Sequence, residues 1–173
     1  LHVPGSAFAS PVSALRHALT DEAARLVVDN SRHGSRFLPL AVQVDAKALV
    51  NGAVALLASG GSTNHTLHLP AIARSAGYEL LWDDLAQLSQ VVPLLAQVYP
   101  NGVADVNQFH AAGGVAWMFK QLLAAGVLHN DVHTVAGFGL DAYAREPYLQ
   151  EGQLAWRELP APSAQESILR PTS

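Results

Sequence analysis

Apolar positions recur at helical spacing in several stretches of the chain, and each stretch is bounded by glycine, proline or a candidate capping residue. The helices that this spacing predicts cover residues 11–19, 21–30, 46–59, 62–76, 83–92, 104–112 and 115–125. Thr20 is a candidate N-cap of the second helix, and Asp45 is a candidate N-cap of the third. The third helix is apolar on nearly every side, which predicts burial, and Pro70 predicts a local bend in the fourth.

Short apolar runs separate several of these helices, as is typical of β-strands. We expect strands at residues 78–81, 94–98 and 132–136, and a turn at Asn101–Gly102. Helices that alternate with short strands predict an α/β fold, here a helix-rich layered domain.

The composition is apolar for a free-standing domain. Of the 173 residues, 50% are hydrophobic and 14% are charged, so we expect part of the surface to be covered by another domain or subunit. The net charge of −4 gives no reason to expect binding to nucleic acid or to an anionic membrane. The sequence has no apolar run of about 18 residues and no basic segment followed by an apolar one. We therefore expect a cytoplasmic protein without a membrane span.

The sequence contains no cysteine, which excludes disulfides, thiolate nucleophiles and cysteine-bound metals within this chain. His65 and His68 lie three residues apart on one predicted helix, but no metalloprotease-type motif accompanies them, and we predict no metal site. His68 stands between two leucines, and we expect it to be a buried, hydrogen-bonded histidine. No nucleophile-elbow, phosphate-loop or dinucleotide fingerprint is present.

Residues 58–70, ASGGSTNHTLHLP, are the most informative stretch of the chain. Gly60 and Gly61 allow a ligand to approach the main chain closely. Ser62, Thr63 or Asn64 can cap the helix that follows, and a helix start of this kind suits a phosphate or a carboxylate. A tight turn between two helices, with a capped second helix and no ligand, accounts for the same pattern.

Other polar side chains are weaker candidates for a functional site. Asp105, Asn107 and His110 lie together in ADVNQFHAAGG, where Asp105 can simply cap a helix. Asn51 lies in an apolar helix, needs a hydrogen-bond partner, and is a candidate for fixing the GGSTN turn. Lys47 is expected to be solvated, as are the basic residues Arg32, His33 and Arg36 in their loop.

The sequence resembles the family of dihydroxy-acid dehydratase and 6-phosphogluconate dehydratase. The resemblance lies in LHVPGSAF (residues 1–8), in GGSTNHTLHL (60–69), and in the segments 82–115 and 122–140. It reaches at least residues 153–157 and so covers most of the chain. His65 after GGSTN, the turn YPNG (99–102) and VAGFGL (135–140) are most similar to the 6-phosphogluconate branch.

The resemblance implies that this chain is the later part of the family's N-terminal, cluster-binding domain. Residues 1–157 would belong to that domain, and residues 158–173, rich in Pro, Ala and Ser, would be a linker toward a C-terminal β-rich domain. Family members bind an iron–sulfur cluster, with 4Fe–4S as our expectation, and a divalent cation is a further candidate cofactor. Because the cluster cysteines are absent here, we expect a fragment that binds no cluster by itself.

The implied activity is the removal of water from 6-phospho-D-gluconate to give 2-dehydro-3-deoxy-6-phosphogluconate, in the Entner–Doudoroff pathway. A metal would polarise the departing C3 oxygen while a base takes the C2 proton. The resemblance implies no catalytic residue in this chain, but a substrate-binding role for Ser62, Thr63, Asn64 and His65, with close backbone approach at Gly60 and Gly61. A homodimer is expected. The alternatives are a dehydratase of another sugar acid or of dihydroxy acids, and a truncated scaffold domain without chemistry.

Overall fold

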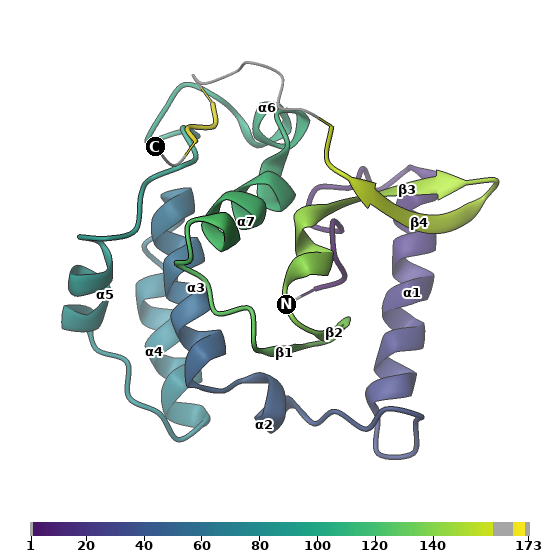
Figure 1. Ribbon diagram of the computed structural model, residues 1–173, viewed down its shortest axis with the longest axis horizontal. Coiled ribbons are helices and arrows are strands. Elements are labelled where there is room, and N and C mark those ends of the chain that lie inside the picture. The colour runs from purple at the N-terminus through teal and green to yellow at the C-terminus, as the bar shows by residue number, and fades with distance from the viewer. Residues whose placement is uncertain (1, 161–167, 172–173) are drawn as a thin grey trace.

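Helices α3 (Ala46–Ser59) and α7 (Gly114–Ala124) pack against each other, with α4 (His65–Ser75) on the other side of α3 (Figure 1). The computed structural model describes residues 2–160 and 168–171. The other helices are α1 (Ala14–Asn30), α2 (Leu40–Gln43), α5 (Trp82–Leu88), α6 (Val106–Ala111) and the 3-10 helix η1 (Asp141–Ala144). Two antiparallel hairpins complete the fold: β1 (His133–Thr134) with β2 (Gly137–Phe138), and β3 (Arg145–Gln150) with β4 (Gln153–Glu158). The prediction of a helix-rich α/β domain with short strands is confirmed, although the strands form hairpins and not a shared sheet.

Helix α3 is bounded by the residues that the sequence indicated. The Asp45 carboxylate accepts a hydrogen bond from Ala48 N at 2.7 Å, which satisfies one of the free N–H groups of the first turn. Gly60 ends the helix in the left-handed conformation, with φ of 57°. Leu49, Ala53 and Val54 are among its buried side chains, so the predicted burial of α3 is confirmed.

The apolar interior is divided into two clusters. The larger cluster joins α3, α6, α7 and η1, and includes Val54, Phe109, Leu122 and Tyr143. The smaller one joins α1 to the N-terminal segment and β4, through Val3, Leu19, Leu26 and the partly buried Trp156. Figure 1 shows α1 on the opposite side of the molecule from α3, α4 and α5, below the β3–β4 hairpin.

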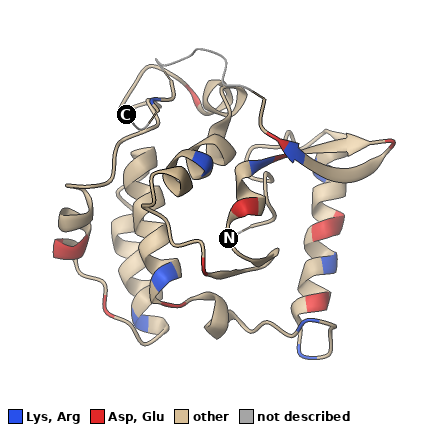
Figure 2. Cartoon of the chain, in the orientation of Figure 1, with Lys and Arg blue, Asp and Glu red and all other residues tan. Residues whose placement is uncertain are grey.

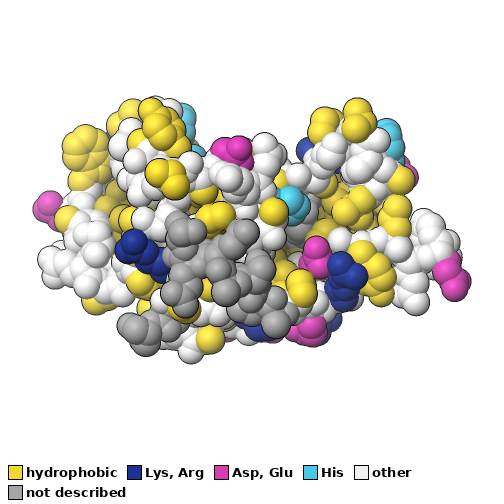
Figure 3. Space-filling view, turned by 90° about the horizontal axis from the view of Figure 1, so that it is seen from above, with side chains coloured by type: hydrophobic (Ala, Val, Ile, Leu, Met, Phe, Trp, Pro, Cys, Tyr) yellow, Lys and Arg dark blue, Asp and Glu magenta, His cyan; other side chains and the backbone are white. Residues whose placement is uncertain are grey.

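Charged residues are few and are spread over the chain (Figure 2), and none of the described ones is buried. On α1, Arg25 forms ion pairs with Glu22 and Asp29, each at 2.6 Å. Such exposed pairs contribute little to stability. Apolar side chains are exposed in several groups on the face that Figure 3 shows. Large apolar side chains that are exposed include Phe37, Leu67, Trp82 and Val103. None of the described helices is long and apolar enough to cross a membrane.

The prediction of two helices over residues 11–30 is wrong, because α1 is continuous. Its N-cap is Ser13, whose Oγ accepts a hydrogen bond from Arg16 N at 3.1 Å. Thr20 caps nothing: its hydroxyl donates to Arg16 O at 2.9 Å, one turn back along the same helix. A threonine that bonds in this way is tolerated inside a helix, and no glycine or proline interrupts the chain there.

The strand predictions are only partly confirmed. Residues 78–81 form no strand among the described residues, and 94–98 contribute only isolated bridges, Ala96 to Leu169 and Val98 to Ala104. The expected strand at 132–136 is reduced to β1. The β3–β4 hairpin was missed, although its two-residue turn, Glu151 and Gly152, has the positive φ values (51° and 82°) that favour tight hairpins.

Part of the expected linker packs against the domain. Ile168 and Leu169 are buried, Gln97 N donates to Ile168 O at 2.8 Å, and Arg170 N donates to Leu95 O at 2.9 Å. Residues 161–167 and 172–173 of the expected linker lie outside the described residues. The boundary at residue 158 stays a prediction.

Candidate functional site

The turn between α3 and α4, residues 60–65, is the candidate site, and we call it the GGSTNH turn. Gly60 N donates to Leu57 O at 3.2 Å, and Gly61 N donates to Leu56 O at 3.1 Å. These bonds satisfy the last carbonyls of α3. Because Gly60 adopts a left-handed conformation, the chain reverses there and enters α4 at His65.

Local hydrogen bonds shape the polar part of the turn. Ser62 Oγ accepts from Asn64 N at 3.2 Å, and His65 N donates to Ser62 O at 3.0 Å. The His65 ring is also held near this carbonyl, with Nδ1 at 3.2 Å from Ser62 O. Helix α4 therefore begins at His65, later than the sequence predicted, and the Asn64 side chain makes no capping bond.

The GGSTNH turn is open to solvent in this chain. Residues 61–65 are all exposed, and the N–H groups of Ser62 and Thr63 have no hydrogen-bond partner among the described residues. Residues 61–65 do not line the cavities at the junction of α6 and α7, beside α1, beside α5, or between α2 and α4. The turn presents donors at the N-terminus of an eleven-residue helix, where an anionic group is favoured.

Asp105 acts as a helix cap. Its carboxylate accepts from Asn107 N and Gln108 N, both at 2.8 Å, and Gln108 Oε1 accepts from Asp105 N at 2.8 Å. This reciprocal arrangement is a capping box. Asn107 is exposed in the first turn of α6, and no hydrogen bond among the described residues joins these side chains to the GGSTNH turn.

His110 lies at a separate cavity of about 330 Å³ between the N-terminal segment and the junction of α6 and α7. Its ring centroid is 6.0 Å from that of Phe8, and Tyr143 lines the same cavity. Burial raises the pKa of Tyr143 to about 12, which the nearby Thr134 offsets only in part. The Thr134 hydroxyl donates to Gly137 O, and Tyr143 Oη has no hydrogen-bond partner among the described residues.

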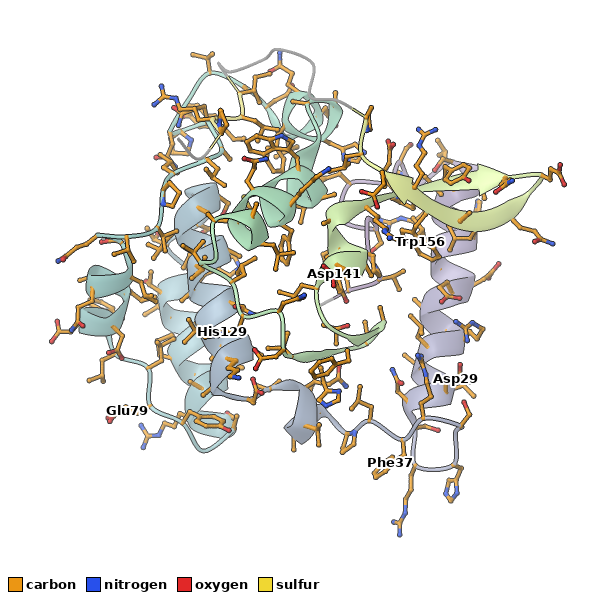
Figure 4. All side chains as sticks on the ribbon, in the orientation of Figure 1. Asp29, Phe37, Glu79, His129, Asp141 and Trp156 are labelled. Atoms are coloured by element: carbon orange, nitrogen blue, oxygen red, sulfur yellow. The ribbon has the colours of Figure 1, made fainter. Side chains whose placement is uncertain are left out.

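The expectation that Asn51 fixes the GGSTN turn is wrong. Asn51 Nδ2 donates to His129 O and its Oδ1 accepts from His129 N, both at 2.8 Å. The buried amide thus fixes the segment after α7 onto α3, where Figure 4 shows His129 beside the helix. Asn51 lies near the middle of α3, and the GGSTNH turn follows the C-terminal end of that helix.

Replacing Asn51 with Ala should lower the free energy of unfolding by about 1–3 kcal/mol, because the main-chain N–H and C=O of His129 both lose their partner. The change can be measured by urea denaturation. Asn107→Ala is the matched control, since the Asn107 side chain is exposed, and it should change stability by less than about 0.5 kcal/mol. Equal effects of the two substitutions would contradict the role of Asn51.

Lys47 is exposed, and its Nζ forms an ion pair with Asp131. The hydrogen bond from Lys47 is the main cause that lowers the pKa of Asp131. Arg32, His33 and Arg36 are exposed in the loop after α1, as expected.

His68 is exposed, so the expectation of a buried histidine is wrong. Its ring stands nearly perpendicular to that of His65, with centroids 6.4 Å apart. The described residues contain no group of three His, Asp or Glu side chains placed to hold a metal ion. An iron–sulfur cluster held by thiolates does not fit this chain, because the sequence contains no cysteine.

The family model described as dihydroxy-acid/6-phosphogluconate dehydratase N-terminal matches residues 1–143. The chain belongs to this dehydratase family. It is 56% identical over 171 residues to the phosphogluconate dehydratase of Pseudomonas aeruginosa, an alignment that covers 99% of the chain and 28% of that relative. The phosphogluconate dehydratase of Escherichia coli (strain K12) is 56% identical over 158 residues, which cover 91% of the chain and 26% of the relative.

A relative from the other branch of the family is more distant. The dihydroxy-acid dehydratase of Nostoc is 39% identical over 118 residues, covering 68% of the chain and 20% of that relative. The chain thus spans little more than a quarter of the length of its phosphogluconate dehydratase relatives. The family is the one that the sequence analysis predicted.

Proposed function

We propose that this chain is part of a 6-phosphogluconate dehydratase, a hydro-lyase that converts 6-phospho-D-gluconate to 2-dehydro-3-deoxy-6-phosphogluconate and water. The observation that carries the proposal is the 56% identity to a phosphogluconate dehydratase over 99% of the chain. The identity to the dihydroxy-acid dehydratase is lower and covers less of the chain. The reaction belongs to the Entner–Doudoroff pathway. A cytoplasmic homodimer is the assembly that we propose.

Any iron–sulfur cluster or divalent cation of the complete enzyme would be held by residues outside this chain. The resemblance favours a 4Fe–4S cluster, whose chemistry would be that of a Lewis acid acting on the departing hydroxyl group. Within the proposal, residues 1–173 contribute no metal ligand and no catalytic residue. Their role is to form one wall of the substrate site.

The GGSTNH turn is the part of that wall that we propose to contact the substrate. Ser62, Thr63 and Asn64 would donate to oxygens of the sugar acid, from hydroxyl, amide and main-chain N–H groups. His65 would donate to a phosphate oxygen from its ring. Gly60 and Gly61 would let the substrate approach the main chain. Asp105 and Asn107 are weaker candidates, because both lie at the capped start of α6. His110 is weaker too, because it lines a different cavity.

Replacing His65 with Ala in the complete enzyme should raise the KM for 6-phosphogluconate and lower kcat/KM by about tenfold. The reason is the loss of one charge-assisted hydrogen bond, which contributes about 1.5–3 kcal/mol. Tenfold corresponds to the lower end of this range, as expected for a bond in an open site. Steady-state kinetics on 6-phosphogluconate measures the change. Replacing His17, exposed on α1, with Ala is the matched control and should leave kcat/KM unchanged. Unchanged kinetics in His65→Ala would remove His65 from the site.

A dehydratase of dihydroxy acids is the second candidate, and the similarity to the Nostoc enzyme favours it over unrelated reactions. Assay of the complete protein on 6-phosphogluconate and on a dihydroxy acid separates the two. Faster turnover of the dihydroxy acid would overturn our proposal. Absence of both activities would favour the truncated scaffold.

A further inference from the structure

Asn101 connects two turns that are far apart in the sequence. Its Nδ2 donates a hydrogen bond of 2.8 Å to Gly60 O, across a separation of 41 residues. The contact is so close that a Cβ atom on Gly60 would lie 2.2 Å from Asn101 Nδ2. The YPNG turn therefore lies directly against the start of the GGSTNH turn.

The main chain around Asn101 is fixed by its own hydrogen bonds. Asn101 N donates to Val98 O at 2.8 Å, and Tyr99 N donates to Ala104 O at 2.9 Å. Gly102 is required in this turn, because a Cβ atom there would lie 2.1 Å from Gln97 O. The segment just before it is tied to the end of α3, since Leu95 N and Ala96 N both donate to Ala58 O. The main chain that carries Asn101 is therefore held in place by hydrogen bonds on both sides of the residue.

The carbonyl that Asn101 holds belongs to the Gly60–Gly61 peptide, whose own N–H group donates to Leu56 O at 3.1 Å. Gly60 and Gly61 follow each other, and glycine has more accessible backbone conformations than any other residue. The orientation of the Gly60–Gly61 peptide sets the direction in which Ser62 leaves helix α3. Among the described residues, Asn101 is the side chain that donates a hydrogen bond to the Gly60 carbonyl on this exposed turn.

We propose that Asn101 is a positioning residue of the dehydratase: it orients the Gly60–Gly61 peptide and so holds residues 62–65 in place for the substrate. The inference rests on the proposed function. Asn101 does not touch the substrate in this proposal, but acts through the turn. It gives the YPNG sequence a part in recognising the sugar acid.

The test is made in the complete enzyme with Asn101→Asp and Asn101→Ala. Asp has nearly the same shape but cannot donate to Gly60 O, so both variants should raise the KM for 6-phosphogluconate by about three- to tenfold, as the loss of one hydrogen bond allows. The value of kcat should change less than KM. Gln90→Glu, an exposed amide changed to an acid, controls for the added charge and should leave both constants unchanged.

A role limited to stability would give a different result. It would lower the fraction of folded enzyme and therefore kcat, with KM unchanged, and that outcome would overturn the inference. Combining Asn101→Ala with His65→Ala gives a second readout. If Asn101 acts through the turn, the double variant should lose less kcat/KM than the two single losses combined, because the part of the Asn101 effect that depends on His65 is already absent. Additive losses would overturn the inference.

The failure of this inference can be told from the failure of the proposed function. A complete, folded enzyme without activity on 6-phosphogluconate would overturn both. An active enzyme in which Asn101→Asp behaves as the wild type would overturn the role of Asn101 alone.

Discussion

Purified residues 1–173 should show neither dehydratase activity nor the visible absorption band of an iron–sulfur cluster, even after reconstitution with iron and sulfide. The chain has no thiolate to bind iron, and its described residues offer no group of three His, Asp or Glu side chains for a metal. The polar groups of the GGSTNH turn are exposed, so they cannot exclude water from a reacting sugar acid. Visible spectroscopy and an assay of 2-keto acid formation measure the two properties.

The complete enzyme, reconstituted in the same way, is the control for this experiment. Under our proposal it should gain both the absorption band and the activity. A stable band in the 173-residue chain would show that other side chains bind the cluster, and would contradict the prediction.

Leu122→Ala should lower the free energy of unfolding by about 2–5 kcal/mol, through lost apolar burial and the cavity left behind. The Leu122 side chain has 0% exposure and lies in the larger apolar cluster. Urea denaturation followed by circular dichroism gives the difference, provided that the slope of the transition stays the same.

Leu67→Ala is the matched control for this substitution. Leu67 is also on a helix, α4, but is 61% exposed, so its replacement should change the free energy of unfolding by less than about 0.5 kcal/mol. A loss at Leu122 as small as the loss at Leu67 would mean that α7 is not packed in solution as the structure has it.

The sequence predicted those features that depend on neighbouring residues. Asp45 and Gly60 bound α3 because a carboxylate cap and a left-handed glycine act within one turn of the helix. The same holds for Asp105 at the start of α6. Thr20 misled the prediction, since threonine favours a cap and also bonds within a helix.

Features that depend on distant residues could not be predicted. The contact of Asn101 with Gly60 and that of Asn51 with His129 join segments 41 and 78 residues apart, and no local pattern encodes them. The exposed state of His68 depends in the same way on what packs beside α4. The hairpin β3–β4 was also missed, although its connection is local: the two-residue turn Glu151–Gly152 joins the strands.

The division of the interior into two apolar clusters makes the domain's resistance to unfolding uneven. Helix α1 gains its burial from the N-terminal segment and β4, whereas α3 and α7 share the larger cluster. Local opening of α1 would therefore leave the peptide at Gly60, with its bond to Asn101, in its native geometry. Amide hydrogens of α1 would therefore exchange with solvent through partial unfolding that needs less free energy than the unfolding that exposes α7. The GGSTNH turn would keep its native structure while α1 is open.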